Sequence, residues 1–313
     1  MPGETKHEAV SIPPSSSSLG GQGGVAGDPA DLEGGKRAID FADAAGDGQT
    51  SAGGAVLPGP CSRAGITFED AAAVAGGGDV ADPEFLEAQQ RLRLQAGETE
   101  RLIKWANVGG LWVEDRIFQQ IAGEQSEGKE PVHGQEHYVR AFRAGDSERV
   151  WKVTKGNHYG VVPSCDGTKA RPSDWFALRP AIPSEYLRRM GLLDVVAPEI
   201  ETRLEGFFMD EGSIKIVTSQ RYFDPEQVRV PPGEVEHYFK LLGFTDLLMT
   251  AGPEWMTCAW YHQDENLAVF DAWPKNTIPF DGRLYPVDVI PISPGPIMAE
   301  LIKRALEVPL GCR

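Results

Sequence analysis

Residues 1–82 contain too few large apolar side chains to form a hydrophobic core. Segments such as SIPPSSSSLGGQGGVAGDPADLEGG consist mainly of Gly, Ala, Ser, Pro and Asp. A segment of this composition buries too little surface to offset the conformational entropy lost on ordering. We therefore predict a disordered N-terminal tail over residues 1–82, in which ITFEDAAAVA (66–75) is at most a transient helix. The folded domain is expected in residues 83–313.

The chain is acidic, with 46 Asp and Glu against 30 Lys and Arg and a formal net charge of −16. Such a charge repels nucleic acids and anionic lipids. No apolar run approaches the roughly 18 residues of a membrane span, and the N-terminus lacks the basic-then-apolar order of a signal peptide. The four cysteines have no CxxC spacing, which indicates neither a zinc site nor a disulfide framework. We expect a cytoplasmic protein without nucleic-acid or membrane partners.

Helical and strand patterns follow the tail. Apolar periodicity predicts helices over 82–95, 97–110, 113–123, 183–196, 231–244 and 296–306. Alternating apolar residues around turn residues predict β-hairpins over 137–154 and 202–223. The first three helices would form a helical extension over 83–124. Strands precede most helices without regular βαβ alternation, so we predict an α+β fold with a mainly antiparallel sheet.

The segment VFDAWPKNTIPFDGRLYPVDVIPI (269–292) places two carboxylates and an amide in a turn-rich stretch. Asn276 and Asp288 offer the hard oxygen ligands that Mg²⁺ prefers. Asp271 is not needed as a ligand and can accept the proton of an attacking hydroxyl group. Taken singly, these residue types are also common in turns and at strand ends.

Two residues earlier in the chain extend this pattern toward phosphoryl transfer. Lys152, in the predicted strand RVWKVT, supplies a positive charge to nucleotide phosphates if it points into a cleft, but not if it faces solvent. Glu185, near the start of its helix, would hold Lys152 by a charge-assisted hydrogen bond. Glu199, Glu201 and Glu205 are alternatives for that pairing.

These stretches resemble the protein-kinase-like superfamily, in particular the minimal kinase-like domains of bacterial and phage polyvalent proteins. The resemblance covers about residues 98–292, with its best matches in GQEHYVRAF, VWKVTKGNHYG, RLEGFF, IVTSQRYF and the segment 269–292. It implies an antiparallel-sheet N-terminal lobe, a reduced C-terminal lobe, and ATP and Mg²⁺ as cofactors.

The resemblance also implies roles for individual residues. Lys152 would be the nucleotide-binding lysine and Asp271 the catalytic-loop aspartate. Asn276 and Asp288 would be the metal ligands. The remaining nucleotide contacts would be Gly134, Gln135 and Glu136 over the phosphates, Gln220 and Arg221 in the adenine-binding linker TSQR, and Lys275 near the γ-phosphate.

Several positions differ from the kinase pattern. Val269 and Phe270 stand where many kinases have His-Arg, and Val289 and Ile290 stand where Phe-Gly follows the metal aspartate. No Ala-Pro-Glu segment follows, so the helical lobe that docks protein substrates is expected to be mostly missing.

We therefore expect an ATP- and Mg²⁺-dependent phosphotransferase that moves the γ-phosphate to a hydroxyl group of a protein or a small molecule. Asp-x4-Asn followed by Asp also resembles the arrangement in aminoglycoside and choline phosphotransferases. Two alternatives stay open at this point. One is a non-catalytic nucleotide-binding interaction module, and the other is a purely structural domain.

Overall fold

The computed structural model describes residues 66–77, 88–117, 136–144, 147–156, 158–169, 174–210, 212–223, 230–247, 256 and 258–307. All of them belong to the unit that spans Ala38–Arg313. Antiparallel strand pairs and packed helices make it an α+β structure, as the sequence predicted. Residues 1–65 and 78–82 of the predicted tail lie outside the described residues.

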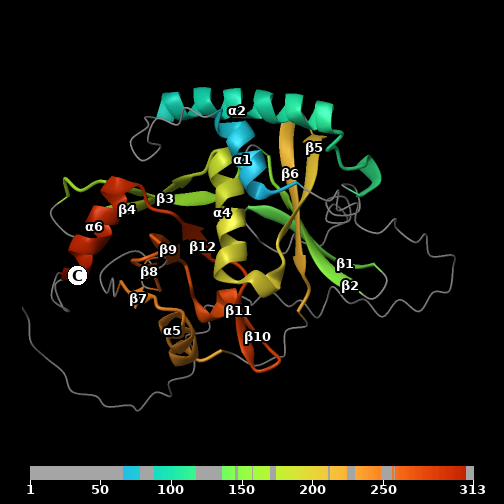
Figure 1. Cartoon of the computed structure of the whole chain (residues 1–313). Helices are drawn as coiled ribbons and strands as arrows, with labels where there is room; N and C mark the ends of the chain where they lie inside the picture. Colours follow the sequence, from blue (N-terminus) through green and yellow to red (C-terminus); the bar gives the residue numbers. More distant parts are fainter. Residues whose placement is uncertain are drawn as a thin grey trace, which may run out of the picture. The chain divides into compact units, whose positions relative to one another are not determined.

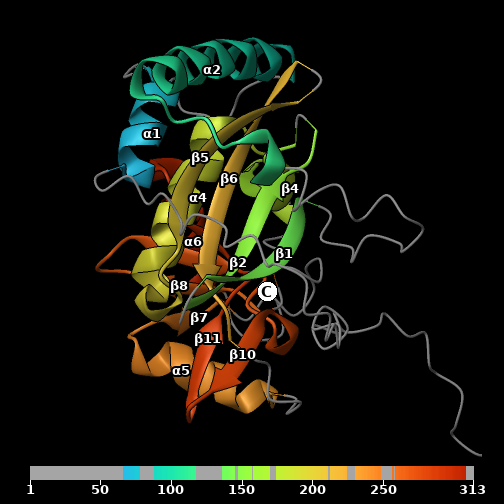
Figure 2. The ribbon, with the colours of Figure 1, turned by 90° about the vertical axis from the view of Figure 1, so that its right-hand side faces the viewer.

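The first sheet contains four antiparallel strands in the order β1-β2-β6-β5 (Figures 1 and 2). The strands are β1 (His137–Ala144), β2 (Ser147–Thr154), β5 (Arg203–Asp210) and β6 (Ser213–Arg221). They form the two hairpins that the sequence predicted, and the pairing of β2 with β6 joins these hairpins. Lys152 therefore lies on an inner strand of the sheet.

Three helices pack together next to this sheet: α1 (Phe68–Gly76), α2 (Ala88–Gly109) and α4 (Pro183–Val196). Helix α4 has the bounds that the sequence predicted, and α2 lies over the ends of β5 and β6 (Figures 1 and 2). Two helices separated near Gly97 were expected, but α2 continues through this glycine. Packing of the buried Leu102 and Ala106 compensates for the low helix propensity of an interior glycine.

Helix α1 shows that the predicted tail boundary was wrong for residues 66–77. Thr67 caps the helix, since its hydroxyl oxygen accepts a hydrogen bond from the Asp70 N–H at 3.0 Å. Phe68 is buried, and its Cβ lies 3.3 Å from where a Cβ on Gly191 of α4 would stand. The small residues of α1 form a stable helix because α4 allows this close approach, and composition alone does not reveal such a partner.

The alternation of β2 determines where Lys152 points. Trp151 and Val153 are buried in a cluster on one face of the sheet. Successive side chains of a strand point to opposite faces, so Lys152 points to the other face. Thr218, directly opposite Lys152 on β6, is hydrogen-bonded to Tyr186 of α4. Lys152 therefore lies on the face that α4 covers.

The remaining elements form a second sheet, two hairpins and their helices. The second sheet has the strand order β12-β9-β8-β7, and β3 pairs with β4 and β10 with β11. The bounds are β3 (Val161–Cys165), β4 (Phe176–Pro180), η5 (Pro198–Ile200), α5 (Pro232–Leu241), β7 (Thr245–Asp246), β8 (Trp260–His262), β9 (Leu267–Phe270), η7 (Pro274–Asn276), β10 (Thr277–Phe280), β11 (Arg283–Pro286), β12 (Ile290–Ile292) and α6 (Pro296–Glu307).

Helices α5 and α6 confirm the two C-terminal helices predicted from the sequence. The buried face of α6, with Met298 and Ile302, shares an apolar cluster with Phe270 and Ile290 of the second sheet. This packing fixes both ends of the segment that carries the predicted site, because that segment begins after β9 and ends before β12.

Candidate functional site

A short loop after β9 brings Asp271 and Asn276 into contact. The backbone of Asp271 is left-handed, with φ of 54°, a conformation that aspartate tolerates better than bulky residues do. The side-chain nitrogen Nδ2 of Asn276 donates to the backbone oxygen of Asp271 at 2.7 Å and to its Oδ2 at 3.0 Å. In the described part of the chain, Oδ1 of Asn276 has no hydrogen-bond partner. It is therefore available to a ligand.

The β10–β11 hairpin returns the chain to this loop. Thr277 lies opposite Pro286, and the Val287 N–H donates to the backbone oxygen of Asn276 at 2.9 Å. Asp288 follows at once and is exposed. The hairpin thus brings the two predicted metal ligands, Asn276 and Asp288, near each other in space, as expected for strands joined by a tight turn.

Lys152 approaches the same place from the first sheet. Burial lowers the pKa of Lys152, and the charge of Asp288 raises it. Within the described residues, the ammonium group of Lys152 has no hydrogen bond or ion pair. A partly buried cation next to an exposed carboxylate is the arrangement that attracts a ligand carrying both phosphates and a metal ion.

The carboxyl group of Asp271 has a raised pKa. Burial raises the pKa of Asp271 to about 6, and the charge of Lys275 and the hydrogen bond from Asn276 oppose this shift. The charge of Asp288 raises the pKa further. A carboxylate with a pKa near 6 is ionised at neutral pH, yet it is more basic than an ordinary aspartate and so is suited to accept a proton.

Glu185 does not pair with Lys152, which corrects the prediction. Its carboxylate binds Arg179 at 2.5 and 2.8 Å and accepts a hydrogen bond from the Ile182 N–H at 3.0 Å. Its position in the first turn of α4 favours this backbone contact. The alternative acids also have other partners: Glu199 lies near Arg283, Glu201 pairs with Arg149 and Arg203, and Glu205 accepts a hydrogen bond from Ser219.

Arg189, which the sequence analysis did not single out, is the residue of α4 that reaches the site. It is 3% exposed, and its Nη1 donates to Oε2 of Glu136 at 3.0 Å. The charges of both residues act on Lys152. Arg189 follows Glu185 by four positions and so lies on the same face of α4, and this spacing was the only sequence signal that pointed to it.

The residues expected at the adenine-binding linker lie at the end of β6. Gln220 is opposite Val150 in the sheet. The guanidinium group of Arg221 lies 5.4 Å from the centre of the Phe223 ring, which in turn stacks on Tyr285 with 4.5 Å between ring centres. These contacts make an aromatic wall at the end of the strand.

Lys275 lies in the Asp271 loop and is exposed, with its ammonium group 5.9 Å from the centre of the Trp273 ring. Its charge acts on Asp271, so the two side chains lie near each other, and its place near the γ-phosphate stays a prediction. Gly134 and Gln135 lie outside the described residues, and their role over the phosphates stays a prediction.

Comparisons with protein families, with curated proteins and with solved structures gave no match. Among the helices that the structure describes, none is both long enough and apolar enough to cross a membrane. The described residues also contain no group of three or more His, Cys, Asp or Glu side chains placed to hold a metal ion.

Proposed function

We propose that the chain binds ATP together with Mg²⁺ and transfers the γ-phosphate to a hydroxyl acceptor. The observation that supports this most is the contact between Asn276 and Asp271, next to Asp288 and within the electrostatic reach of Lys152. In phosphoryl transfer the protein supplies positioning and charge rather than covalent chemistry, and these four residues offer both.

The proposed roles follow from the surroundings of each side chain. Lys152 would neutralise the nucleotide phosphates, because its ammonium group has no protein partner within the described residues. Asp271 would accept the hydroxyl proton at its carboxylate. Asn276 holds that carboxylate in place and stabilises its ionised form by a hydrogen bond.

The donor set fits Mg²⁺ bound to nucleotide. Mg²⁺ keeps several waters and usually takes one or two protein oxygens together with phosphate oxygens. Oδ1 of Asn276 and the carboxylate of Asp288 are two such oxygens, and neither has a hydrogen-bond partner in the part of the chain described. When bound, the ion would neutralise charge on the phosphates. A site of this kind needs no cluster of three acidic or imidazole side chains.

One observation favours the alternative of a nucleotide-binding module without turnover. Active protein kinases require an ion pair between the strand lysine and a helix glutamate. Here the helix glutamate, Glu185, is bound to Arg179. The acidic residues that act on Lys152 are instead Asp288 and Glu136. Their negative charges raise the pKa of Lys152, whereas burial lowers it.

Thermal unfolding with and without ATP and Mg²⁺ tests nucleotide binding. A ligand that binds only the folded chain at a hundred times its Kd stabilises it by about 2.7 kcal/mol. We expect Lys152→Met to remove most of this stabilisation, whereas Lys303→Met, at an exposed position on α6, should not. The absence of a shift at millimolar ATP, or an equal shift in Lys152→Met, would overturn the proposal. Incubation with labelled ATP and acceptor hydroxyl compounds then distinguishes turnover from binding alone.

A further inference from the structure

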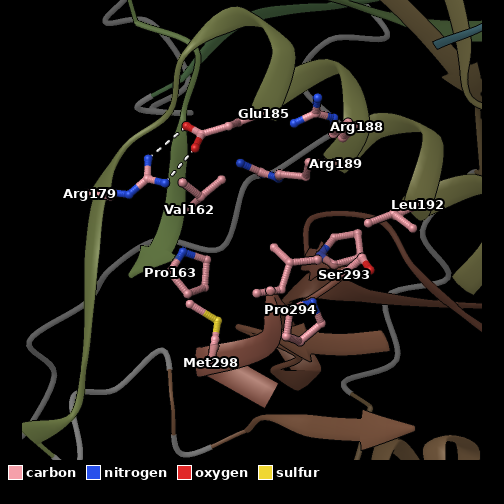
Figure 3. A pocket seen from close by; sticks show the side chains of 13 residues that line it. Val162, Pro163, Arg179, Glu185, Arg188, Arg189, Leu192, Ser293, Pro294 and Met298 are labelled. Carbon is pink, nitrogen blue, oxygen red and sulfur yellow. Dashed lines mark hydrogen bonds and ion pairs between the residues drawn. The ribbon is translucent and has the colours of Figure 1, made fainter. Parts of the chain in front are cut away.

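A cavity of about 230 Å³ lies between α4, the β3–β4 hairpin and the segment that leads into α6 (Figure 3). Lys152, Asp271 and Asp288 do not line it, so it is separate from the candidate nucleotide site except at Arg189, which borders both. Its volume is below the roughly 300–1,000 Å³ of pockets that take drug-sized ligands. A ligand of this cavity would have to be small.

One side of the cavity is basic. Arg179, Arg188 and Arg189 line it. Arg179 is neutralised by Glu185, and Arg189 by Glu136. Arg188 is exposed and has no ion-pair partner among the described residues. The cavity therefore keeps a surplus of positive charge in a chain whose formal net charge is −16.

One buried hydrogen-bond donor is left open at this side, and a helix begins beside it. The side chain of Arg189 reaches from α4 into the cavity, and its Nε has no hydrogen-bond partner among the described residues although Arg189 is 3% exposed (Figure 3). A buried N–H without a partner is rare and costs free energy. Ser293 and Gly295 line the cavity just before α6, and the N-terminus of a helix carries partial positive charge. Both features favour an anion.

The other side of the cavity is apolar. Val162, Pro163 and Met298 line it, opposite the arginines of α4 (Figure 3). An inorganic ion would leave this wall without a contact. A ligand with an apolar part would remove it from water and gain the corresponding hydrophobic free energy.

We propose that this cavity binds a small amphipathic oxyanion, namely an aromatic or alkyl group that carries one phosphate or carboxylate. The charged group lies against Arg188 and Arg189, and the apolar group lies against Val162, Pro163 and Met298. Phosphate and carboxylate both match the planar donor pair of a guanidinium group. The binding does not depend on whether the chain uses ATP.

Phenyl phosphate and benzoate are suitable probes, because each combines one ring with one oxyanion. Binding to the full chain is measured by ligand-detected NMR and by thermal unfolding, without nucleotide. Inorganic phosphate and benzyl alcohol each carry only one half of the probe, so we expect both to bind more weakly. Binding of either probe above these two controls supports the proposal, and binding of neither probe overturns it.

Substitutions locate the probe. Arg188→Gln should weaken probe binding by about tenfold, the effect of losing one charge-assisted contact. Arg93→Gln removes an exposed arginine of α2 outside the cavity and should leave binding unchanged. Ser293→Asp adds a negative charge to the cavity and should weaken binding, whereas Ser293→Ala should not.

One further substitution, Lys152→Met, separates the two sites. Lys152→Met should not affect the probe, because Lys152 does not line this cavity. If Lys152→Met abolishes probe binding, or if Arg188→Gln and Ser293→Asp both bind like the unchanged protein, the probe binds elsewhere and the assignment of this cavity is wrong. Failure of ATP to bind would leave these results unaffected, so the two proposals are tested independently.

Discussion

Asn276 and Asp271 are joined by two hydrogen bonds from one amide nitrogen, to the backbone oxygen of Asp271 at 2.7 Å and to its carboxylate at 3.0 Å. The first bond stabilises the left-handed backbone of Asp271, and the second orients its carboxylate. The other carboxylate oxygen of Asp271 has no hydrogen-bond partner among the described residues. Asp271 is thus positioned to meet a proton donor.

Asp271→Asn should separate binding from transfer. Asparagine tolerates the left-handed backbone but cannot accept a proton, so we expect ATP binding close to normal and transfer reduced by about 10²- to 10⁴-fold. Asp281→Asn is a matched control, because Asp281 also has a positive φ, of 50°, and is exposed in the β10–β11 turn. Equal loss of ATP binding and transfer in Asp271→Asn would mean that this carboxylate is not the base.

The raised pKa of Asp271 should lower stability as the pH rises. In the folded chain the pKa of Asp271 is about 6, whereas its ordinary value is 3.8. Between these two pH values the Asp271 carboxyl group is protonated in the folded state and ionised in the unfolded state, so the folded state binds more protons. The free energy of unfolding should therefore fall from about pH 4 to about pH 6. Asp271→Asn removes this loss and should be more stable above pH 6, on the order of 1 kcal/mol for a partly exposed group.

Urea unfolding of both proteins at about pH 4 and about pH 7.5 measures this difference. The stability advantage of Asp271→Asn should appear only at the higher pH. Asp281→Asn again serves as the control, since it removes a carboxylate from an exposed turn. An advantage of the same size at both pH values would show that the carboxyl group has an ordinary pKa.

Phe68→Ala should destabilise the fold, although Phe68 lies in a segment that composition assigns to a disordered tail. Phe68 is 6% exposed and belongs to the apolar cluster that contains Tyr186 and Met190 of α4. Truncation of a buried phenylalanine costs about 3–5 kcal/mol. Ala73→Ser, on the exposed face of α1, should change stability by less than about 0.5 kcal/mol. Equal stability of both variants in urea would show that α1 does not pack on α4.

Gly206→Ala should also destabilise the fold. Gly206 has φ of +139°, and a Cβ there would overlap the backbone oxygen of Leu111, which accepts the Phe207 N–H at 2.9 Å. The backbone strain alone costs about 1–3 kcal/mol. Gly233 has open space around its Cβ position, so Gly233→Ala should be neutral or stabilising. A mutant Gly206→Ala as stable as the native chain would mean that the segment at Leu111 does not pair with β5.

Local patterns in the sequence were sufficient to predict those elements that are determined by residues close together in the chain. Alternation and turn residues predicted the two hairpins, and helix periodicity predicted the bounds of α4. The order of Asp271, Asn276 and Asp288 is read directly from the sequence. The pairings within these hairpins join neighbours along the chain, and the pairing of β10 with β11 brings Asn276 and Asp288 together.

Tertiary packing decided the remaining features. The alternation of β2 leaves both directions open for Lys152, and only the pairing with β6 and the packing of α4 select the face toward Asp288. Arg179 lies on a neighbouring strand and takes Glu185 away from the lysine that the sequence pattern assigned to it. Helix α1 becomes stable only against α4. The contacts that place Lys152 and α1 join segments far apart in the sequence, and such contacts leave no periodic pattern in either segment. Arg179 and Glu185 are only six positions apart, but their pairing depends on how β4 lies against the start of α4.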